Sequence, residues 1–241
     1  MLATDIINLM TSLHDSSKAE HLAHFFKTGK GEYGEGDKFL GITVPQTRAI
    51  VKRYKSVIEC DDIVSLICSE WHEIRLAGFL LLAGLFKSAI KQGLIDRAKS
   101  LLELYLTNID KGNNWDLVDL VAPEILGQWI CLYPDDEKIL DELAQIERLW
   151  HQRVAIVATF PLIKRGQFEP TFRVATSYLK HRHDLIHKAT GWMLRETGKR
   201  GGKEELIEFL NNYKSVMPRT MLRYAIEKFS EEERKYFMQR N

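Results

Sequence analysis

The feature that most constrains the fold of this chain is a short pattern that recurs at intervals of 34 to 39 residues. Its copies are Trp71–Ala77, Trp150–Ala155 and, in a looser form, Arg219–Ala225. The alanines that end these copies, together with Ala189, are spaced by 78, 34 and 36 residues, and 78 is twice 39. Regular intervals of roughly 20 to 50 residues indicate a chain built from repeated units of secondary structure.

Apolar residues recur at helical spacing through most of the chain, whereas alternating runs typical of strands are few. We expect helices from Thr4 or Asp5 to Leu13, from Ser16 or Ser17 through Phe26, from Pro45 to Tyr54, and from Glu231. Paired helices are expected at 61–69 and 73–88, 94–107 and 115–130, 136–146 and 150–165, 170–180 and 185–197, and 204–212 and 218–229.

Two helices in each repeat predict an all-α fold, specifically a right-handed α-solenoid of HEAT-like helical repeats. The recurrent alanine lets neighbouring helices approach closely, and the second helices of the pairs are expected to line a concave face. A single globular bundle is the alternative, but it would not need a repeat.

All 241 residues are expected to form a single domain, with a flexible glycine-rich loop at about residues 28–38. Four glycines fall within eight residues of this loop, and glycine leaves the backbone many conformations. Because these glycines do not follow a strand, a phosphate-binding P-loop is not indicated.

The net charge, the cysteines and the apolar runs of the chain indicate which partners it can bind and which cellular compartment suits it. The net charge is only +1, so attraction to a polyanion depends on how the basic residues are distributed. The three cysteines, Cys60, Cys68 and Cys131, are unclustered, which suits the reducing cytosol. No apolar run approaches the roughly 20 residues needed to cross a bilayer, and the first residues lack a secretory signal. We therefore expect a cytoplasmic protein that does not engage a membrane.

Basic residues become more frequent toward the C-terminal half, where several lie at helix starts or in the Gly198–Gly202 loop. Basic residues interleaved with tryptophan are typical of surfaces that bind a nucleic-acid backbone, although charge runs are usually only solvated faces. The concave row is expected to carry Trp115, Asp119, Arg153, Lys188, Trp192, Arg195 and Arg223. The basic residues expected to contact such a backbone are Lys164, Arg165, Lys188, Arg195, Lys199, Arg200, Lys203, Arg219 and Arg223.

The hexapeptide Asn114–Asp119 is the strongest candidate for chemistry. In a helix that begins near Asn114, Trp115 and Asp119 lie one turn apart on one face, and Asp116 lies on another. An indole face attracts cations, and a carboxylate stabilises developing positive charge. By itself the hexapeptide also fits a core tryptophan beside an acid that favours the helix dipole. The phase of the repeat, the cationic stripe around Trp192 and the order of four motifs described below together favour the functional interpretation and leave Asp116 a structural role.

His181, His183 and His187 suggest a metal site at first, since the last two are one helical turn apart. No carboxylate or cysteine completes an obvious third ligand, and no zinc-protease motif is present in the sequence. The sequence also lacks a Ser-His-Asp elbow, a nucleotide-binding glycine motif and a kinase signature. We expect neither a metal nor a cofactor.

Four motifs occur in a set order, namely Leu40–Pro45, Trp115–Asp119, Trp150–Ala155 and Ala189–Arg195. In this combination the chain resembles the DNA alkylation repair family of HEAT-like-repeat DNA glycosylases, of the AlkD type. The resemblance runs from about residue 5 to about residue 230. It implies excision of purines alkylated at N3 or N7, chiefly 3-methyladenine and 7-methylguanine, from double-stranded DNA in base excision repair.

The resemblance also implies roles for single residues in a monofunctional hydrolase. Asp119 matches the catalytic carboxylate of the family. Trp115 and Trp192 match its active-site tryptophans, and Arg153 matches its active-site arginine. The chain departs from the family pattern in its longer glycine-rich loop and in Phe25 or Phe26, where tyrosine is expected. A groove for DNA needs no second copy, so we expect a monomer.

Two other functions are kept open. One is a non-catalytic HEAT-repeat protein that binds damaged or branched DNA, although binding alone would not require all four active-site matches together. The other is a protein-binding scaffold, which would show no salt-dependent affinity for DNA.

Overall fold

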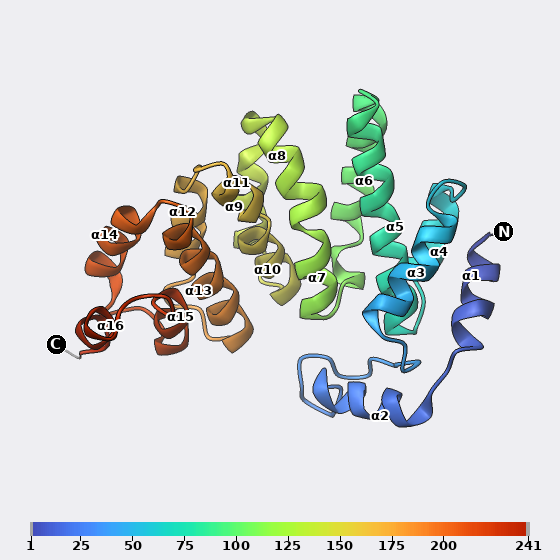
Figure 1. Ribbon diagram of the computed structural model, residues 1–241, viewed down its shortest axis with the longest axis horizontal. Helices are drawn as coiled ribbons and strands as arrows, with labels where there is room; N and C mark the ends of the chain where they lie inside the picture. Colours follow the sequence, from blue (N-terminus) through green and yellow to red (C-terminus); the bar gives the residue numbers. More distant parts are fainter. Residues whose placement is uncertain (1, 240–241) are drawn as a thin grey trace. The chain divides into compact units, whose positions relative to one another are not determined.

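The computed structural model describes residues 2–239, and every regular element in that range is a helix (Figure 1). The predicted all-α class is confirmed. Backbone contacts divide the chain into two units, Met1–Val121 and Ala122–Asn241. Within each unit consecutive helices pack in pairs, as expected for helical repeats. None of the helices described is both long and apolar enough to cross a membrane.

The first unit is organised around α5 (His72–Lys91), the longest helix of residues 2–239. The other elements are α1 (Leu2–Thr11), α2 (Ser16–Phe25), α3 (Val44–Tyr54), α4 (Cys60–Ile67), α6 (Ile95–Thr107), η1 (Ile109–Lys111) and α7 (Trp115–Val121). Helix α5 packs against α3, α4, α6 and α7, and its first two turns are buried. Because a helix covered on several sides cannot leave charges unpaired, the charged residues at its start need partners.

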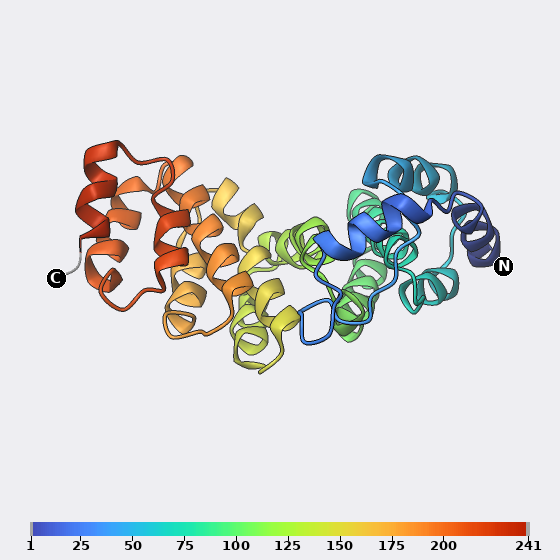
Figure 2. The same ribbon diagram turned by 90° about the horizontal axis from the view of Figure 1, so that it is seen from below.

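The second unit contains a row of second helices that lie side by side, since α13 (Asp184–Lys199) packs against both α10 (Leu149–Val157) and α15 (Arg219–Ala225) (Figure 2). The other elements are η2 (Pro123–Gly127), α8 (Gln128–Leu132), η3 (Pro134–Glu137), α9 (Lys138–Gln145), α11 (Phe160–Lys164), α12 (Glu169–Ser177), α14 (Lys203–Tyr213) and α16 (Glu231–Met238).

Two predicted helices are interrupted at prolines. The helix expected at 115–130 ends at Val121, and residues Pro123–Gly127 form a π-helical turn in which the Gly127 N–H donates to Ala122 O at 3.0 Å. The helix expected at 150–165 ends at Val157 and resumes at Phe160, with Pro161 in the new first turn. Proline has no N–H and its ring clashes with the preceding turn, so an unbroken α-helix was the wrong expectation at both places.

Small residues hold the second helices close together, as the repeat predicts. The repeated alanines, Ala77, Ala155, Ala189 and Ala225, are all buried. Gly191 of α13 faces α15 so closely that a Cβ atom there would lie 2.5 Å from Met221 O and from Tyr224 Cβ. The two helices can pack at this distance only because position 191 carries no side chain.

The glycine-rich loop at 28–38 is folded into successive turns. The Gly29 N–H donates to the Glu32 carboxylate at 2.9 Å, and the Gly34 N–H donates to Lys27 O at 3.0 Å. Gly34 lies against the chain, because a Cβ atom there would come within 2.6 Å of Phe26 O. The loop ends in Asp37, which is buried. Its end is therefore anchored in the core of the first unit.

Candidate functional site

A buried asparagine directly precedes helix α7. Asn114 is fully buried; its side-chain Oδ1 accepts from the Trp115 N–H at 2.9 Å, and its Nδ2 donates to Phe26 O at 3.3 Å. The side-chain oxygen thus satisfies one of the free N–H groups at the helix start, and the amide nitrogen ties that start to the end of α2.

The residues of α7 divide between a buried face and a half-buried face. Asp116, Leu117 and Val118 are buried, whereas Trp115 and Asp119 are half-buried and lie one helical turn apart. The pKa of the Tyr105 phenol is raised by its complete burial and, to a lesser degree, by the negative charge of Asp119. The Asp119 carboxylate therefore lies within electrostatic reach of a buried phenol.

Trp115 is packed into a group of aromatic rings in the first unit. Its indole stacks on Phe26 with ring centroids 5.3 Å apart, and Phe25 meets it edge-on at 6.1 Å. Phe26 in turn stacks on Phe39 at 5.2 Å. Phe25 is 55% exposed, so one aromatic ring beside Trp115 is open to solvent. Exposed aromatic rings of this kind can stack against a planar base or sugar.

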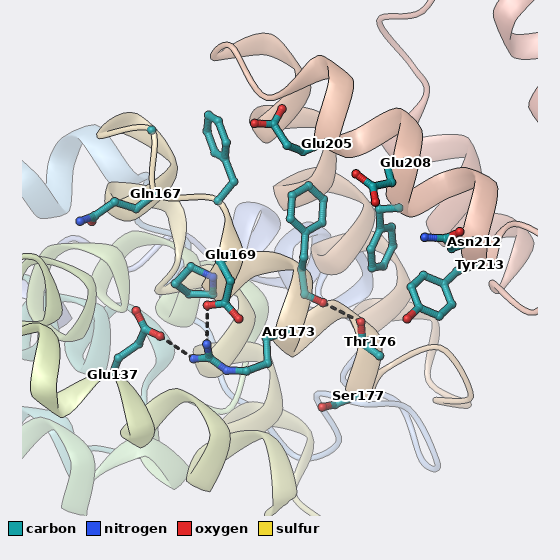
Figure 3. A pocket seen from close by; sticks show the side chains of 15 residues that line it. Glu137, Gln167, Glu169, Arg173, Thr176, Ser177, Glu205, Glu208, Asn212 and Tyr213 are labelled. Atoms are coloured by element: carbon teal, nitrogen blue, oxygen red, sulfur yellow. Dashed lines mark hydrogen bonds and ion pairs between the residues drawn. The ribbon is translucent and has the colours of Figure 1, made fainter.

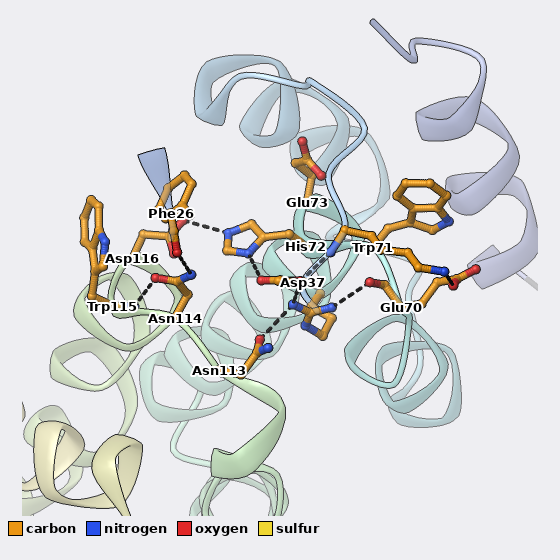
Figure 4. Close-up of polar contacts among 12 residues, drawn as sticks. Phe26, Asp37, Glu70, Trp71, His72, Glu73, Asn113, Asn114, Trp115 and Asp116 are labelled. Atoms are coloured by element: carbon orange, nitrogen blue, oxygen red, sulfur yellow. Dashed lines mark hydrogen bonds and ion pairs between the residues drawn. The ribbon is translucent and has the colours of Figure 1, made fainter. Parts of the chain in front are cut away.

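Behind α7 lies a buried cluster of charges that the sequence analysis did not anticipate (Figure 4). The imidazole of His72 bridges two carboxylates, with Nδ1 2.8 Å from Asp37 Oδ2 and Nε2 2.9 Å from Asp116 Oδ2. Arg75 Nη2 donates to the other oxygen of Asp37 at 2.6 Å. Two carboxylates are thus matched by one guanidinium and one imidazole ring.

The carboxylates keep His72 protonated. Burial by itself would lower the pKa of the imidazole, but the hydrogen bonds to Asp116 and Asp37 raise it from 6.5 to about 9. Burial also opposes ionisation of Asp37, yet the bonds from His72 and the charge of Arg75 leave its pKa below the ordinary value. At neutral pH the ring therefore carries both protons and donates to both aspartates.

Arg75 also fixes the segment that leads into α7. Its Nε donates to Lys111 O at 3.1 Å, and its Nη2 donates to Asn113 Oδ1 at 2.8 Å. The repeat places Arg153 at the equivalent position of α10, and there Nη1 donates to Leu185 O at 2.7 Å, in the first turn of α13. Each arginine is buried and holds the start of the next second helix in its own unit.

Trp192 is half-buried on α13, and its indole lies 6.1 Å from the ring of Phe160. Two of the predicted DNA-contacting cations lie over the same phenyl ring, Lys164 at 4.3 Å and Arg200 at 5.4 Å from its centroid. Cations over an aromatic ring gain a modest attraction and remain available to other anions. The second unit thus places positive charge beside Trp192.

Five of the nine predicted DNA-contacting residues form ion pairs with carboxylates. The pairs are Lys188–Asp184 at 2.7 Å, Arg195–Glu227, Lys199–Glu196 at 2.9 Å, Arg200–Glu196 at 3.4 Å and Lys203–Glu233 at 2.7 Å. Of the others besides Lys164, Arg165 donates to Cys131 O, Arg219 donates to Met238 O, and Arg223 is exposed. A phosphate has to compete with these carboxylates. Exposed pairs such as Lys188–Asp184 are weak enough for that exchange, whereas Glu196 is buried and is shared by Lys199 and Arg200.

The three histidines near the start of α13 form a local hydrogen-bond network. His183 precedes the helix and accepts from the Leu185 N–H through Nδ1 at 3.2 Å. His181 contacts the side chain of Gln152 at 2.9 Å, and His187 contacts the carbonyl of His181. Burial first, then repulsion within the cluster, lowers the pKa of His181. Burial also lowers the pKa of His183, although the negative charge of Asp184 opposes this shift. Within residues 2–239 no group of three histidine, cysteine or acidic side chains is placed to hold a metal.

Each unit contains a cavity among its described residues, and the one in the first unit borders the aromatic rings beside Trp115. In the first unit, a largely apolar cavity of about 410 Å³ lies between α2, residues 39–45 and the start of α5, with Asp116 in its wall. In the second unit, a groove of about 1020 Å³ is lined by α12 and α14 (Figure 3). Arg173 in this groove is held by Glu137, Asp141 and Glu169. None of the predicted site residues lines the groove.

Comparisons with known proteins agree with the resemblance seen in the motifs. The model of a family described as DNA alkylation repair enzyme matches residues 6–229. Among solved structures, the chain is similar to a "Predicted DNA alkylation repair enzyme from Enterococcus faecalis", with a TM-score of 0.69 and 16% sequence identity. That likeness covers 90% of this chain and 97% of the other. No curated protein matches the sequence.

Proposed function

This chain belongs to the DNA alkylation repair enzyme family, and we propose that it is a glycosylase that hydrolyses the N-glycosidic bond of purines alkylated at N3 or N7. The substrates would be lesions such as 3-methyladenine and 7-methylguanine in double-stranded DNA. The observation that carries the proposal is the pairing of Asp119 with Trp115 on the half-buried face of α7.

The chemistry of such lesions suits a single carboxylate. An N-alkylated purine is already cationic, so it leaves with the electrons of the C1′–N bond as a neutral base and needs no general acid. The sugar becomes oxocarbenium-like, and Asp119 would stabilise this charge. A water molecule then bonds to C1′, and its proton passes to the carboxylate or to solvent. The products are the free base and an abasic site.

The two tryptophans and Arg153 are assigned supporting roles. The indole faces of Trp115 and Trp192 would attract the cationic nucleoside. Arg153 would contact a phosphate and orient the reacting groups, in addition to holding the start of α13. These assignments follow the family motif, and substitution of each residue can test them separately.

Release of free base tests the proposal directly. We expect the purified protein to liberate 7-methylguanine or 3-methyladenine from double-stranded DNA treated with a methylating agent, detected by chromatography of the ethanol-soluble fraction. The DNA should retain alkali-labile abasic sites and show no strand cleavage before alkali treatment. A preparation that binds this DNA but releases neither base would refute glycosylase activity and favour a non-catalytic role.

The basic residues at the C-terminal end of α13 provide a test of DNA binding. Replacing Lys199 or Arg200 by alanine is expected to weaken binding to any DNA sequence and to reduce the slope of log Kd against log salt by about one. The reason is that each cation would exchange Glu196 for a phosphate. Lys138→Ala, on the first helix of a pair, makes the same charge change and should leave the slope unaltered. An unchanged slope in the α13 variants would remove these residues from the interface.

A further inference from the structure

The buried charges behind α7 contact the first turn of that helix through Asp116. Asp116 Oδ2 bonds to His72, while Oδ1 is buried with no hydrogen-bond partner among residues 2–239. His72 is the first residue of α5, and its other nitrogen holds Asp37 at the end of the glycine-rich loop. One imidazolium therefore links that loop, helix α5 and the first turn of α7.

The residues on both sides of Trp115 are fixed by contacts to other elements. Asn114 is bonded to Phe26 O, and Asp116 is bonded to His72. Trp115 itself packs on Phe26, and Asp119 follows it by one turn. Since α7 is only seven residues long, the orientation of its first turn sets the direction of the whole helix.

Stability alone does not explain why charges occupy this place. A buried ion network is commonly no more stable than an apolar cluster of the same volume, because desolvation offsets the attraction between the charges. Hydrogen bonds to charged groups are directional, however, and they select one arrangement of the elements they join. A site that needs a carboxylate held within a fraction of an ångström benefits from such a support.

We propose that Asp116 and His72 are positioning residues, which fix the rotation of α7 and thereby the direction of Asp119 and Trp115. The proposal rests on the proposed function of Asp119 as the catalytic carboxylate. Neither Asp116 nor His72 takes part in the chemical step. They increase the fraction of time that the Asp119 carboxylate spends in the orientation that the reaction requires.

Two substitutions at one position separate positioning from charge. Asp116→Leu keeps the branched shape of the side chain and removes every hydrogen bond to His72. Asp116→Asn keeps one hydrogen bond to His72. Its amide N–H can donate to Nε2 of a neutral imidazole, whose Nδ1–H still donates to Asp37. Asp96→Leu, at an exposed position in the first turn of α6, is the matched control. For each variant, Kd for methylated DNA, the single-turnover rate of base release and amide exchange across α7 and α13 are measured.

We expect Asp116→Leu to release base at least about tenfold more slowly, because small displacements of a reacting group have large kinetic effects. Its Kd should stay within about twofold of wild type, since Asp116 is buried and carries no positive charge that could pair with a phosphate. Amides of α7 should exchange faster while those of α13 keep wild-type protection. Asp116→Asn should restore both rate and protection to within about threefold, and Asp96→Leu should resemble wild type.

The proposal would be overturned if Asp116→Leu released base at the wild-type rate and its α7 amides exchanged as slowly as in wild type. A loss of rate that Asp116→Asn does not rescue would also overturn it. If wild type releases no base, the glycosylase function fails, and amide exchange across α7 still decides whether Asp116 fixes the helix. If Asp116→Leu does not fold, as lost protection of α13 would show, His72→Gln decides instead, since glutamine is too short to bridge both aspartates.

Discussion

Replacing Asp119 by asparagine is expected to slow the release of 7-methylguanine from methylated DNA at least about 100-fold, the size of effect seen when one electrostatic stabiliser is removed. The amide has nearly the shape of the carboxylate but no charge, so the oxocarbenium-like sugar loses its counter-charge. Asp119 is half-buried, and partial exclusion of water makes that charge more effective. Single-turnover rates with excess enzyme measure the chemical step.

Binding affinity separates the chemistry of Asp119 from a role in recognition. Removing a negative charge that faces phosphates should leave Kd for methylated DNA unchanged or lower it. Asp96→Asn, the same substitution at an exposed position of α6, is the control and should release base at the wild-type rate. A rate for Asp119→Asn within about threefold of wild type would exclude Asp119 as the catalytic carboxylate.

The second large effect concerns the pH dependence of stability. His72 has a pKa raised from 6.5 to about 9, so between these values the folded protein holds a proton that the unfolded chain releases. The resulting stabilisation is fully present below pH 6.5 and is lost as the pH rises through 9. A shift of this size corresponds to about 3 kcal/mol in the free energy of unfolding. Denaturant unfolding at pH 6.5, 8 and 9.5 should show that decline.

Asp116→Asn is the matched variant for this measurement. It removes one of the two carboxylates that raise the pKa of His72, so less of the stabilisation should be lost between pH 6.5 and 9.5. The other ionisable groups are present in both proteins, so their contributions cancel in the comparison. Equal losses in wild type and Asp116→Asn would show that the His72–Asp116 contact does not carry the pH dependence.

Features that depend on a single helix could be predicted from the sequence. The spacing of apolar residues gave the helices, and residues four apart in one helix share a face, so Trp115 and Asp119 could be paired without a structure. The breaks at Pro123 and Pro161 were missed because apolar periodicity continues across them. In both places the proline was visible, and its missing N–H is the reason for the break.

The charged row on α13 shows the limit of a pattern confined to one helix. The sequence identified Lys188, Arg195 and Lys199 as a cationic stripe, which the helix geometry supports. Their carboxylate partners lie partly outside α13, since Glu227, which pairs with Arg195, follows the end of α15. The strength of a positive surface depends on such partners, and their distance in the chain hides them from periodicity.

The sequence by itself determined the all-helical class, the repeat of small residues that lets helices pack closely, and the face that Trp115 and Asp119 share. Only the tertiary structure decided that Asp37 and Asp116 meet at His72, because they are 35 and 44 residues away from it and lie on different elements. Helical spacing is a property of neighbours in the chain. The protonation of a buried side chain depends on the groups that packing places next to it. Here packing places two carboxylates against the imidazole of His72, behind the proposed site.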